Sequence, residues 1–120
     1  MTETKPFFSM NDNIIKESVR EACDGIKREL SEDICKIYLY GSCARGDYND
    51  DSDIDIAIMT KCDRMSSKKY GETMAEIATA VAMKYNTIVN FVCIPYKEYL
   101  ENKNWYPYFE SIERDGICID

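Results

Sequence analysis

Residues 38–46 read Tyr-Leu-Tyr-Gly-Ser-Cys-Ala-Arg-Gly, and residues 53–55 read Asp-Ile-Asp. An apolar run ends at the Gly41-Ser42 turn, ten residues follow, and two carboxylates then arrive at the spacing of a strand. A turn of small residues exposes backbone N–H groups that can hold phosphate oxygens. Carboxylates at positions i and i+2 of a strand point the same way and can share divalent cations. The two stretches therefore predict a site for a metal-bound nucleoside triphosphate.

The hydrophobic pattern around this site predicts an α+β fold, with helices packed against a small mixed β-sheet. We expect helices from Asn11 or Asp12 to Leu30, over 42–46, over 66–85 and, interrupted at Pro107, over 96–115. We expect strands over 34–40, 53–60, 87–94 and 117–119, and a polar loop over 47–52. In the second strand, period-two alternation assigns the isoleucines at 54, 56 and 58 to the core and the aspartates to the other face.

The length of 120 residues indicates one domain over 1–120, in which residues 1–10 form a poorly ordered lead-in. No apolar run approaches the roughly 20 residues that span a bilayer. The start also lacks a basic segment followed by an apolar one, so no secretory signal is visible. The sequence therefore predicts a cytoplasmic protein.

The formal net charge is −7, and no cluster of Lys or Arg stands out against it. Such a chain repels a nucleic-acid backbone, so we expect no nucleic-acid partner. A small nucleotide escorted by Mg²⁺ stays compatible with this charge, because the metal supplies the missing positive charge.

The chain has no histidine, which excludes Ser-His and Cys-His nucleophilic mechanisms. Its six cysteines include no C-x-x-C pair, so zinc and dithiol sites have no support. We expect most of them to be small buried apolar side chains. Cys43 lies inside the predicted phosphate turn, where it is either a tolerated small residue or a reactive, regulatory thiol.

Three better-known motifs fail on this stretch. An EF-hand loop starting at Asp51 would need Gly at its sixth position and Glu at its twelfth, where the chain has Ile56 and Cys62. A P-loop starting at Gly41 would need Lys where Asp47 stands, and no G-x-G-x-x-G occurs. The remaining aspartates of the loop, Asp47, Asp50 and Asp51, are interpreted as solvated.

The pattern Gly41-Ser42-x10-Asp53-x-Asp55 resembles the nucleotidyltransferase superfamily of DNA polymerase β type. The match is closest to the minimal nucleotidyltransferases, small stand-alone domains with Ala-Arg-Gly after the Gly-Ser turn and Ser-Asp-Ile-Asp-Ile at the carboxylates. The resemblance implies the polymerase β-like fold for the whole chain.

The resemblance also implies roles for these residues. Gly41 and Ser42 would hold the β- and γ-phosphates of ATP or another nucleoside triphosphate. Asp53 and Asp55 would be the catalytic carboxylates and bind Mg²⁺ ions in a two-metal site. Arg45 would either neutralise phosphate charge or pair with an aspartate of the loop.

One position departs from the family pattern. Active members usually carry a third carboxylate on the next strand, whereas residues 87–94 contain neither Asp nor Glu. Asn90 is the nearest polar candidate for this position, but an amide cannot act as a base. Glu98, Glu101 and Tyr85 are the alternative groups that the sequence offers nearby.

We therefore expect a Mg²⁺-dependent nucleotidyltransferase that moves a nucleoside monophosphate to a hydroxyl acceptor. In related minimal domains the acceptor lies on a HEPN-type toxin partner, so the resemblance implies a small helical protein partner and an antitoxin-like role. The alternative is a degenerate relative that binds a nucleotide or a protein without turnover. The aromatic run Trp105-Tyr-Pro-Tyr-Phe109 either caps the core or docks such a partner.

Overall fold

The structure is a computed structural model that describes residues 12–46, 53–63, 65 and 68–119. The expected lead-in over 1–10 and the polar loop over 47–52 lie outside these residues. The described elements, in chain order, are α1 (Asp12–Leu30), the short 3₁₀ helix η1 (Ser31–Asp33), β1 (Ile34–Tyr40), α2 (Ser42–Arg45), β2 (Ile54–Thr60), the 3₁₀ helix η2 (Lys68–Tyr70), α4 (Gly71–Tyr85), β3 (Val89–Pro95), α5 (Tyr96–Asn102), α6 (Pro107–Asp115) and β4 (Ile117–Cys118).

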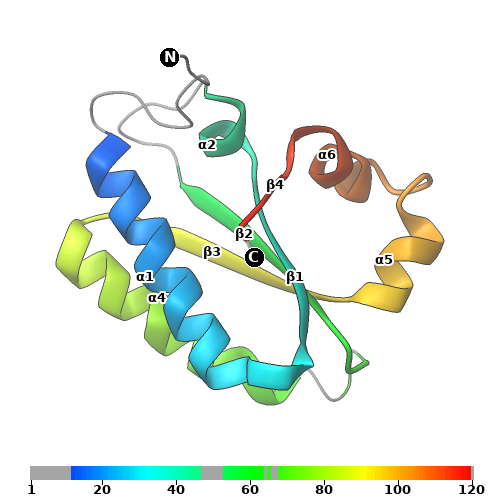
Figure 1. The fold of residues 1–120 in the computed structure, drawn as a ribbon, viewed down its shortest axis with the longest axis horizontal. Coiled ribbons are helices and arrows are strands. Elements are labelled where there is room, and N and C mark those ends of the chain that lie inside the picture. The colour runs from blue at the N-terminus through cyan, green and yellow to red at the C-terminus, as the bar shows by residue number, and fades with distance from the viewer. Residues whose placement is uncertain (1–11, 47–52, 64, 66–67, 120) are drawn as a thin grey trace.

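The described strands form one mixed sheet in the order β3-β2-β1-β4 (Figure 1). β1 runs antiparallel to both β2 and β4, whereas β2 and β3 are parallel and are joined through α4. A parallel pair needs a crossover connection of this kind, because its two strands start at the same end of the sheet. The predicted α+β fold with a small mixed sheet is confirmed.

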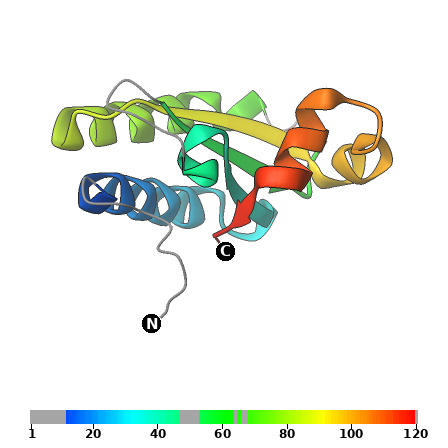
Figure 2. The same ribbon diagram turned by 90° about the horizontal axis from the view of Figure 1, so that it is seen from above.

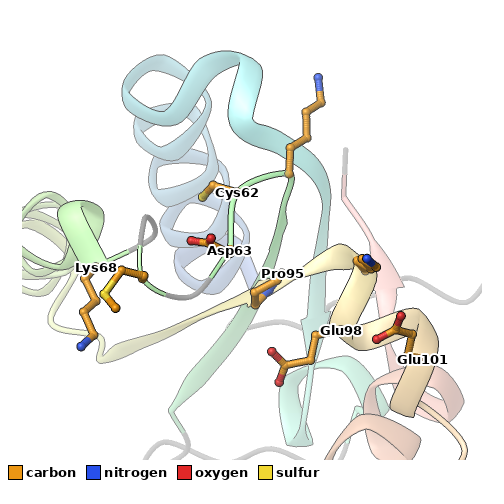
Figure 3. A pocket seen from close by; sticks show the side chains of 9 residues that line it. Cys62, Asp63, Lys68, Pro95, Glu98 and Glu101 are labelled. Carbon is orange, nitrogen blue, oxygen red and sulfur yellow. The ribbon is translucent and has the colours of Figure 1, made fainter.

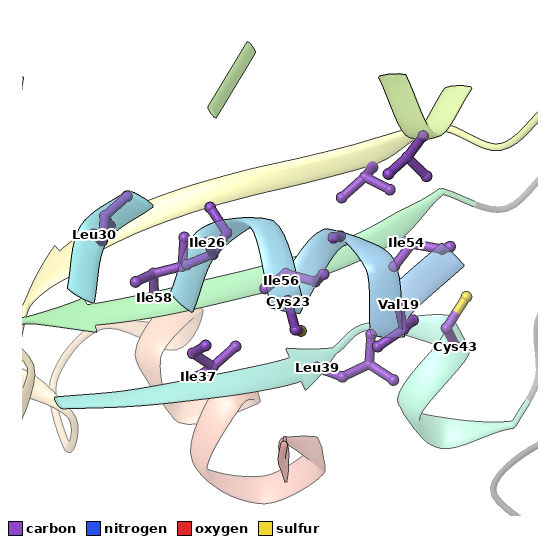
Figure 4. Close-up of a cluster of buried hydrophobic side chains, with 13 residues drawn as sticks. Val19, Cys23, Ile26, Leu30, Ile37, Leu39, Cys43, Ile54, Ile56 and Ile58 are labelled. Carbon is purple, nitrogen blue, oxygen red and sulfur yellow. The ribbon is translucent and has the colours of Figure 1, made fainter. Parts of the chain in front are cut away.

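One face of the sheet is covered by α1 and α4, which lie side by side (Figures 1 and 2). Their apolar residues recur every three or four positions and pack on Ile54, Ile56 and Ile58 of β2, as the alternation predicts (Figure 4). Val19, Ala22, Ile26 and Leu30 of α1 are buried at this spacing. None of the helices in the described ranges is long and apolar enough to cross a membrane.

The opposite face is covered by α5 and α6, which corrects one expectation. Ala57 and Met59 share the face of the aspartates, yet both are fully buried against Tyr99 of α5 and Phe109 of α6. The alternation assigned only the isoleucine face to the core, because the aromatic residues that cover the other face come 40 or more positions later in the chain. β2 is thus a central strand with two packed faces.

Two predicted boundaries shift by a few residues. The strand expected from Thr87 begins at Val89, and the Thr87 hydroxyl donates to Ser18 Oγ of α1 at 3.1 Å. The helix expected over 66–85 is a 3₁₀ turn followed by α4, which begins at Gly71. Residues 66 and 67 lie outside the described part of the chain.

The C-terminal third matches its prediction closely. Pro107 is the first residue of α6, a position where proline loses no hydrogen bond, so the predicted interruption is confirmed. After Gly116 the chain returns to the sheet as β4, the predicted short edge strand. This return brings the end of α6 next to β1 and the turn that follows it.

Candidate functional site

The two carboxylates and the asparagine come together where β2 and β3 begin. Asp55 and Asn90 are register partners in the parallel β2–β3 pair, and Asp53 lies just before β2. The Asn90 amide donates to Asp53 Oδ2 at 3.0 Å and to Asp55 Oδ1 at 3.3 Å. The sequence had placed all three groups near one another, and the structure brings them within hydrogen-bonding distance.

This group places two carboxylates next to each other. Burial raises the pKa of Asp55 and the neighbouring Asp53 charge adds to the rise, whereas the hydrogen bond from Asn90 opposes it. The hydrogen-bond donor that the two carboxylates share is thus a neutral amide. Such an arrangement is stabilised by a cation, because two adjacent carboxylates repel each other.

The Gly41 turn packs directly on Asp55. Tyr40 is the register partner of Asp55 in the β1–β2 pair, so the turn after β1 lies beside that carboxylate. Gly41 has φ 78° and ψ −160°, a backbone region essentially confined to glycine. A Cβ atom at this position would lie 2.5 Å from Asp55 Oδ2. The glycine therefore allows both the turn and the close approach.

Arg45 ends the helical turn α2 and pairs with a residue that the sequence did not suggest. Its Nη1 lies 3.6 Å from Asp115 Oδ2, at the end of α6. The expected partners, Asp47, Asp50 and Asp51 of the loop, lie outside the described residues. Nothing in the local sequence points to Asp115, because it is 70 positions away and reaches Arg45 only through the α6–β4 return.

Cys43 is buried beneath the same turn. Its thiol is 1% exposed and donates to the backbone oxygen of Asp53 at 3.6 Å. Burial, followed by the charges of Asp55 and Asp53, raises the pKa of this thiol to about 11. These properties favour the small buried residue over the reactive thiol. The expectation that most cysteines are buried is wrong, because only Cys23 and Cys43 are.

We expect alkylation to separate these cysteines. At pH 8 a thiol of pKa about 11 is thiolate in about one molecule in a thousand, and Cys43 is also shielded from reagent. Exposed Cys118 should therefore react with iodoacetamide at least 100-fold faster than Cys43, an order-of-magnitude expectation from the thiolate fraction. Peptide mass spectrometry over a time course measures both rates. Equal rates in the folded protein would contradict the buried position of Cys43.

The alternative groups for the third carboxylate position lie elsewhere. The Tyr85 hydroxyl donates to Glu21 of α1 at 2.9 Å, within the layer of helices α1 and α4 that covers one face of the sheet. Glu98 and Glu101 line a depression of about 770 Å³ beyond the last residues of β2 and β3, the opposite end from Asn90 (Figure 3). Asn90 is thus the one of these four residues that reaches the carboxylates.

The aromatic run divides between the two interpretations that the sequence left open. Phe109 is 3% exposed and its ring contacts that of Tyr99 in α5, which is 2% exposed, so Phe109 belongs to the core. Trp105 is 76% exposed and Tyr106 is 51% exposed, between α5 and α6. The docking role stays a prediction that the exposure of Trp105 and Tyr106 suits, and the side chain of Tyr108 lies outside what the structure describes.

Comparison with known proteins identifies the family. A family model described as polymerase beta, nucleotidyltransferase matches residues 25–102, and the chain therefore belongs to the polymerase β-type nucleotidyltransferases. This confirms the family that the Gly-Ser and Asp-Ile-Asp stretches indicate.

Two Methanocaldococcus jannaschii proteins, both provisionally named protein adenylyltransferases, are similar to this chain. MJ0141 is 27% identical over 88% of the chain and 98% of its own length. MJ0604 is 29% identical over 75% of the chain and 83% of its own length. A solved structure described provisionally as a minimal nucleotidyltransferase shares the fold, with a TM-score of 0.52 and 18% identity over 87% of this chain and 93% of that one.

Proposed function

We propose that this chain transfers a nucleoside monophosphate from Mg²⁺-bound ATP, or another nucleoside triphosphate, to a hydroxyl group of a protein. The observation that carries the proposal is the close approach of the Gly41 turn to the Asp53–Asp55 pair. A phosphate-binding turn and a pair of metal-binding carboxylates must lie this close if one metal-bound triphosphate is to contact both.

The donor atoms at the site suit Mg²⁺. Two carboxylates and an amide offer hard oxygen ligands. The thiol of Cys43 also lies nearby, but it donates to the backbone oxygen of Asp53 and its raised pKa disfavours the thiolate that would bind a softer metal. Asp53 and Asp55 would hold the metal, with Asn90 beside them. When bound, the metal would neutralise charge on the phosphates and on the attacking hydroxyl.

The chain's own residues would do the positioning. Backbone N–H groups after Gly41 and the Ser42 hydroxyl would receive the β- and γ-phosphates, and Arg45 would add a positive charge at the end of the same turn. Asn90 cannot take the proton of the acceptor hydroxyl, because an amide is not a base at neutral pH. We therefore assign Asn90 to ligand and carboxylate positioning.

A protein acceptor is supported by the provisional names of the two relatives, both of which describe a protein adenylyltransferase. The negative net charge of the chain also disfavours a nucleic-acid acceptor. A small helical protein of the HEPN type, which the resemblance to minimal nucleotidyltransferases implies, is the partner that we propose.

Calorimetric titration tests the nucleotide site directly. We expect ATP, or one of the other three triphosphates, to bind in MgCl₂ and at least about tenfold more weakly in EDTA, since the metal would neutralise charge on both the carboxylates and the phosphates. The double variant Asp53→Asn, Asp55→Asn should lose the Mg²⁺-dependent part, whereas Asp24→Asn on the exposed face of α1 should not. Absence of binding by all four triphosphates would refute the proposed function.

The second candidate is a degenerate domain that binds nucleotide without turnover, and the amide at position 90 is the observation that favours it. Asn90→Asp separates the two. A third carboxylate should tighten Mg²⁺ binding and raise nucleotide transfer by about 10- to 100-fold, the usual scale for metal-site partners. Transfer is followed with ATP labelled on its α-phosphate. A robust wild-type rate that Asn90→Asp does not increase would remove the argument for degeneracy.

A further inference from the structure

The C-terminal segment of the chain lies beside the turn that follows β1. α6 and β4 run next to α2 in both views of the fold (Figures 1 and 2). Backbone pairing fixes this arrangement, since Leu39 of β1 is the register partner of Ile117 of β4. Gly41 follows Leu39 by two residues, and Asp115 precedes Ile117 by two. The sheet thus holds the end of α6 close to the turn.

Asp115 connects two arginines at this place. Arg114 donates from Nε to Asp115 Oδ1 at 3.2 Å and from Nη2 to Oδ2 at 3.1 Å. The same Oδ2 lies 3.6 Å from Arg45 Nη1. The Asp115 side chain is only 13% exposed, compared with 43% for Arg45 and 69% for Arg114. The carboxylate is therefore the most buried member of the group.

We propose that Asp115 is a positioning residue for Arg45, which it holds in place at the end of the phosphate-binding turn before the nucleotide arrives. This inference rests on the proposed function, because it takes the turn to be the phosphate site. It adds a residue of the C-terminal segment, outside the matched region 25–102, to the nucleotide site.

Two physical arguments favour positioning over competition between Asp115 and the phosphates. An arginine side chain loses rotamer freedom when it is fixed on a ligand, and a carboxylate that has already fixed it reduces this loss on binding. Arg114 meanwhile neutralises Asp115 through two hydrogen bonds, so the carboxylate adds little net repulsion at the phosphates.

A charge-matched variant isolates this effect. Arg114→Gln with Asp115→Asn removes one positive and one negative charge, so the net charge is unchanged. We expect Kd for ATP in MgCl₂ to rise by about twofold to tenfold, the scale of ordering one long side chain. In an Arg45→Gln background the same pair of substitutions should change Kd by less than about 1.5-fold, because the residue that it positions is already absent. Asp115→Glu as a single substitution keeps the carboxylate, so it should raise Kd less than the charge-matched pair does.

A second measurement does not need the nucleotide. In the free protein, NMR relaxation of the Arg45 side-chain Nε should report an ordered guanidinium in the wild type and a mobile one in the charge-matched variant. The control removes another arginine–acid pair, Glu17→Gln with Arg20→Gln on α1, and should leave both Kd and the Arg45 signal unchanged. If the charge-matched variant does not fold, the Arg45 signal of the wild type still tests whether the guanidinium is ordered before nucleotide binds.

The outcomes separate this inference from the proposed function. If wild type binds no triphosphate, the proposed function fails. A mobile Arg45 in the wild type overturns the inference by itself. An unchanged or lower Kd in the charge-matched variant overturns it too, as does an equal rise in Kd in the Arg45→Gln background, which would indicate a general structural effect.

Discussion

Gly41→Ala should lower the affinity for Mg²⁺-bound ATP by about 100-fold or more and destabilise the fold by about 1–3 kcal/mol. The φ of 78° with ψ near −160° is strained for any residue with a Cβ atom, which accounts for the loss of stability. The new Cβ would also lie 2.5 Å from Asp55 Oδ2. Either the turn or the carboxylate must move, and both belong to the proposed nucleotide site. Calorimetry and thermal unfolding measure the two effects.

Gly71→Ala is the matched control for this substitution. Gly71 is the first residue of α4, its φ is not positive, and a Cβ atom there meets nothing within 4 Å. Alanine should stabilise the protein by up to about 1 kcal/mol at this position, with no change in nucleotide affinity. Normal ATP binding by Gly41→Ala, or equal losses in both variants, would contradict the arrangement described for the turn.

Asp55→Asn should have opposite effects on binding and on stability. Mg²⁺-dependent affinity for ATP should fall by about 100-fold or more, because one of the two carboxylates that we propose hold the metal is lost. The metal-free protein should unfold about 2–4 °C higher, since the substitution removes a partly buried charge beside Asp53 and keeps an oxygen for the Asn90 amide. Differential scanning calorimetry in EDTA measures the second effect.

The control for Asp55→Asn is Asp24→Asn, which removes the same charge from an exposed position on α1. It should change neither affinity nor unfolding temperature beyond experimental error. A lower unfolding temperature for Asp55→Asn than for wild type in EDTA would show that the carboxylate stabilises the fold by itself. The need for a cation at the site would then lose its main support.

Local pattern was enough to predict most of the fold. β1 was predicted at Ile34–Tyr40 and is found there, because an apolar run between two breaking segments leaves little choice. The burial of Ala57 and Met59 was missed, since it depends on aromatic residues that come 40 or more positions later and fold back over β2. Such long-range coverage leaves no trace in the alternation of a single strand.

The candidate site divides in the same way. Asp53, Asp55 and Gly41 were predicted to meet because short connections and strand geometry place them at one end of the sheet. Asn90 was found through the expectation of a third group on the next strand. Asp115 could not be found, because its place near Arg45 depends on the route of α5, α6 and β4 around the far face.

The two packed faces of β2 have a consequence for how the protein opens. Amide hydrogens of a central strand covered on both sides exchange with solvent only when the whole domain unfolds, whereas those of edges and short helices exchange through small local openings. The Asp-Ile-Asp stretch sits at the start of this most protected strand, but the Gly41 turn and the short β4 belong to more weakly protected parts. Warming should therefore loosen the turn that we propose binds the phosphates well before it changes the spacing of the two carboxylates.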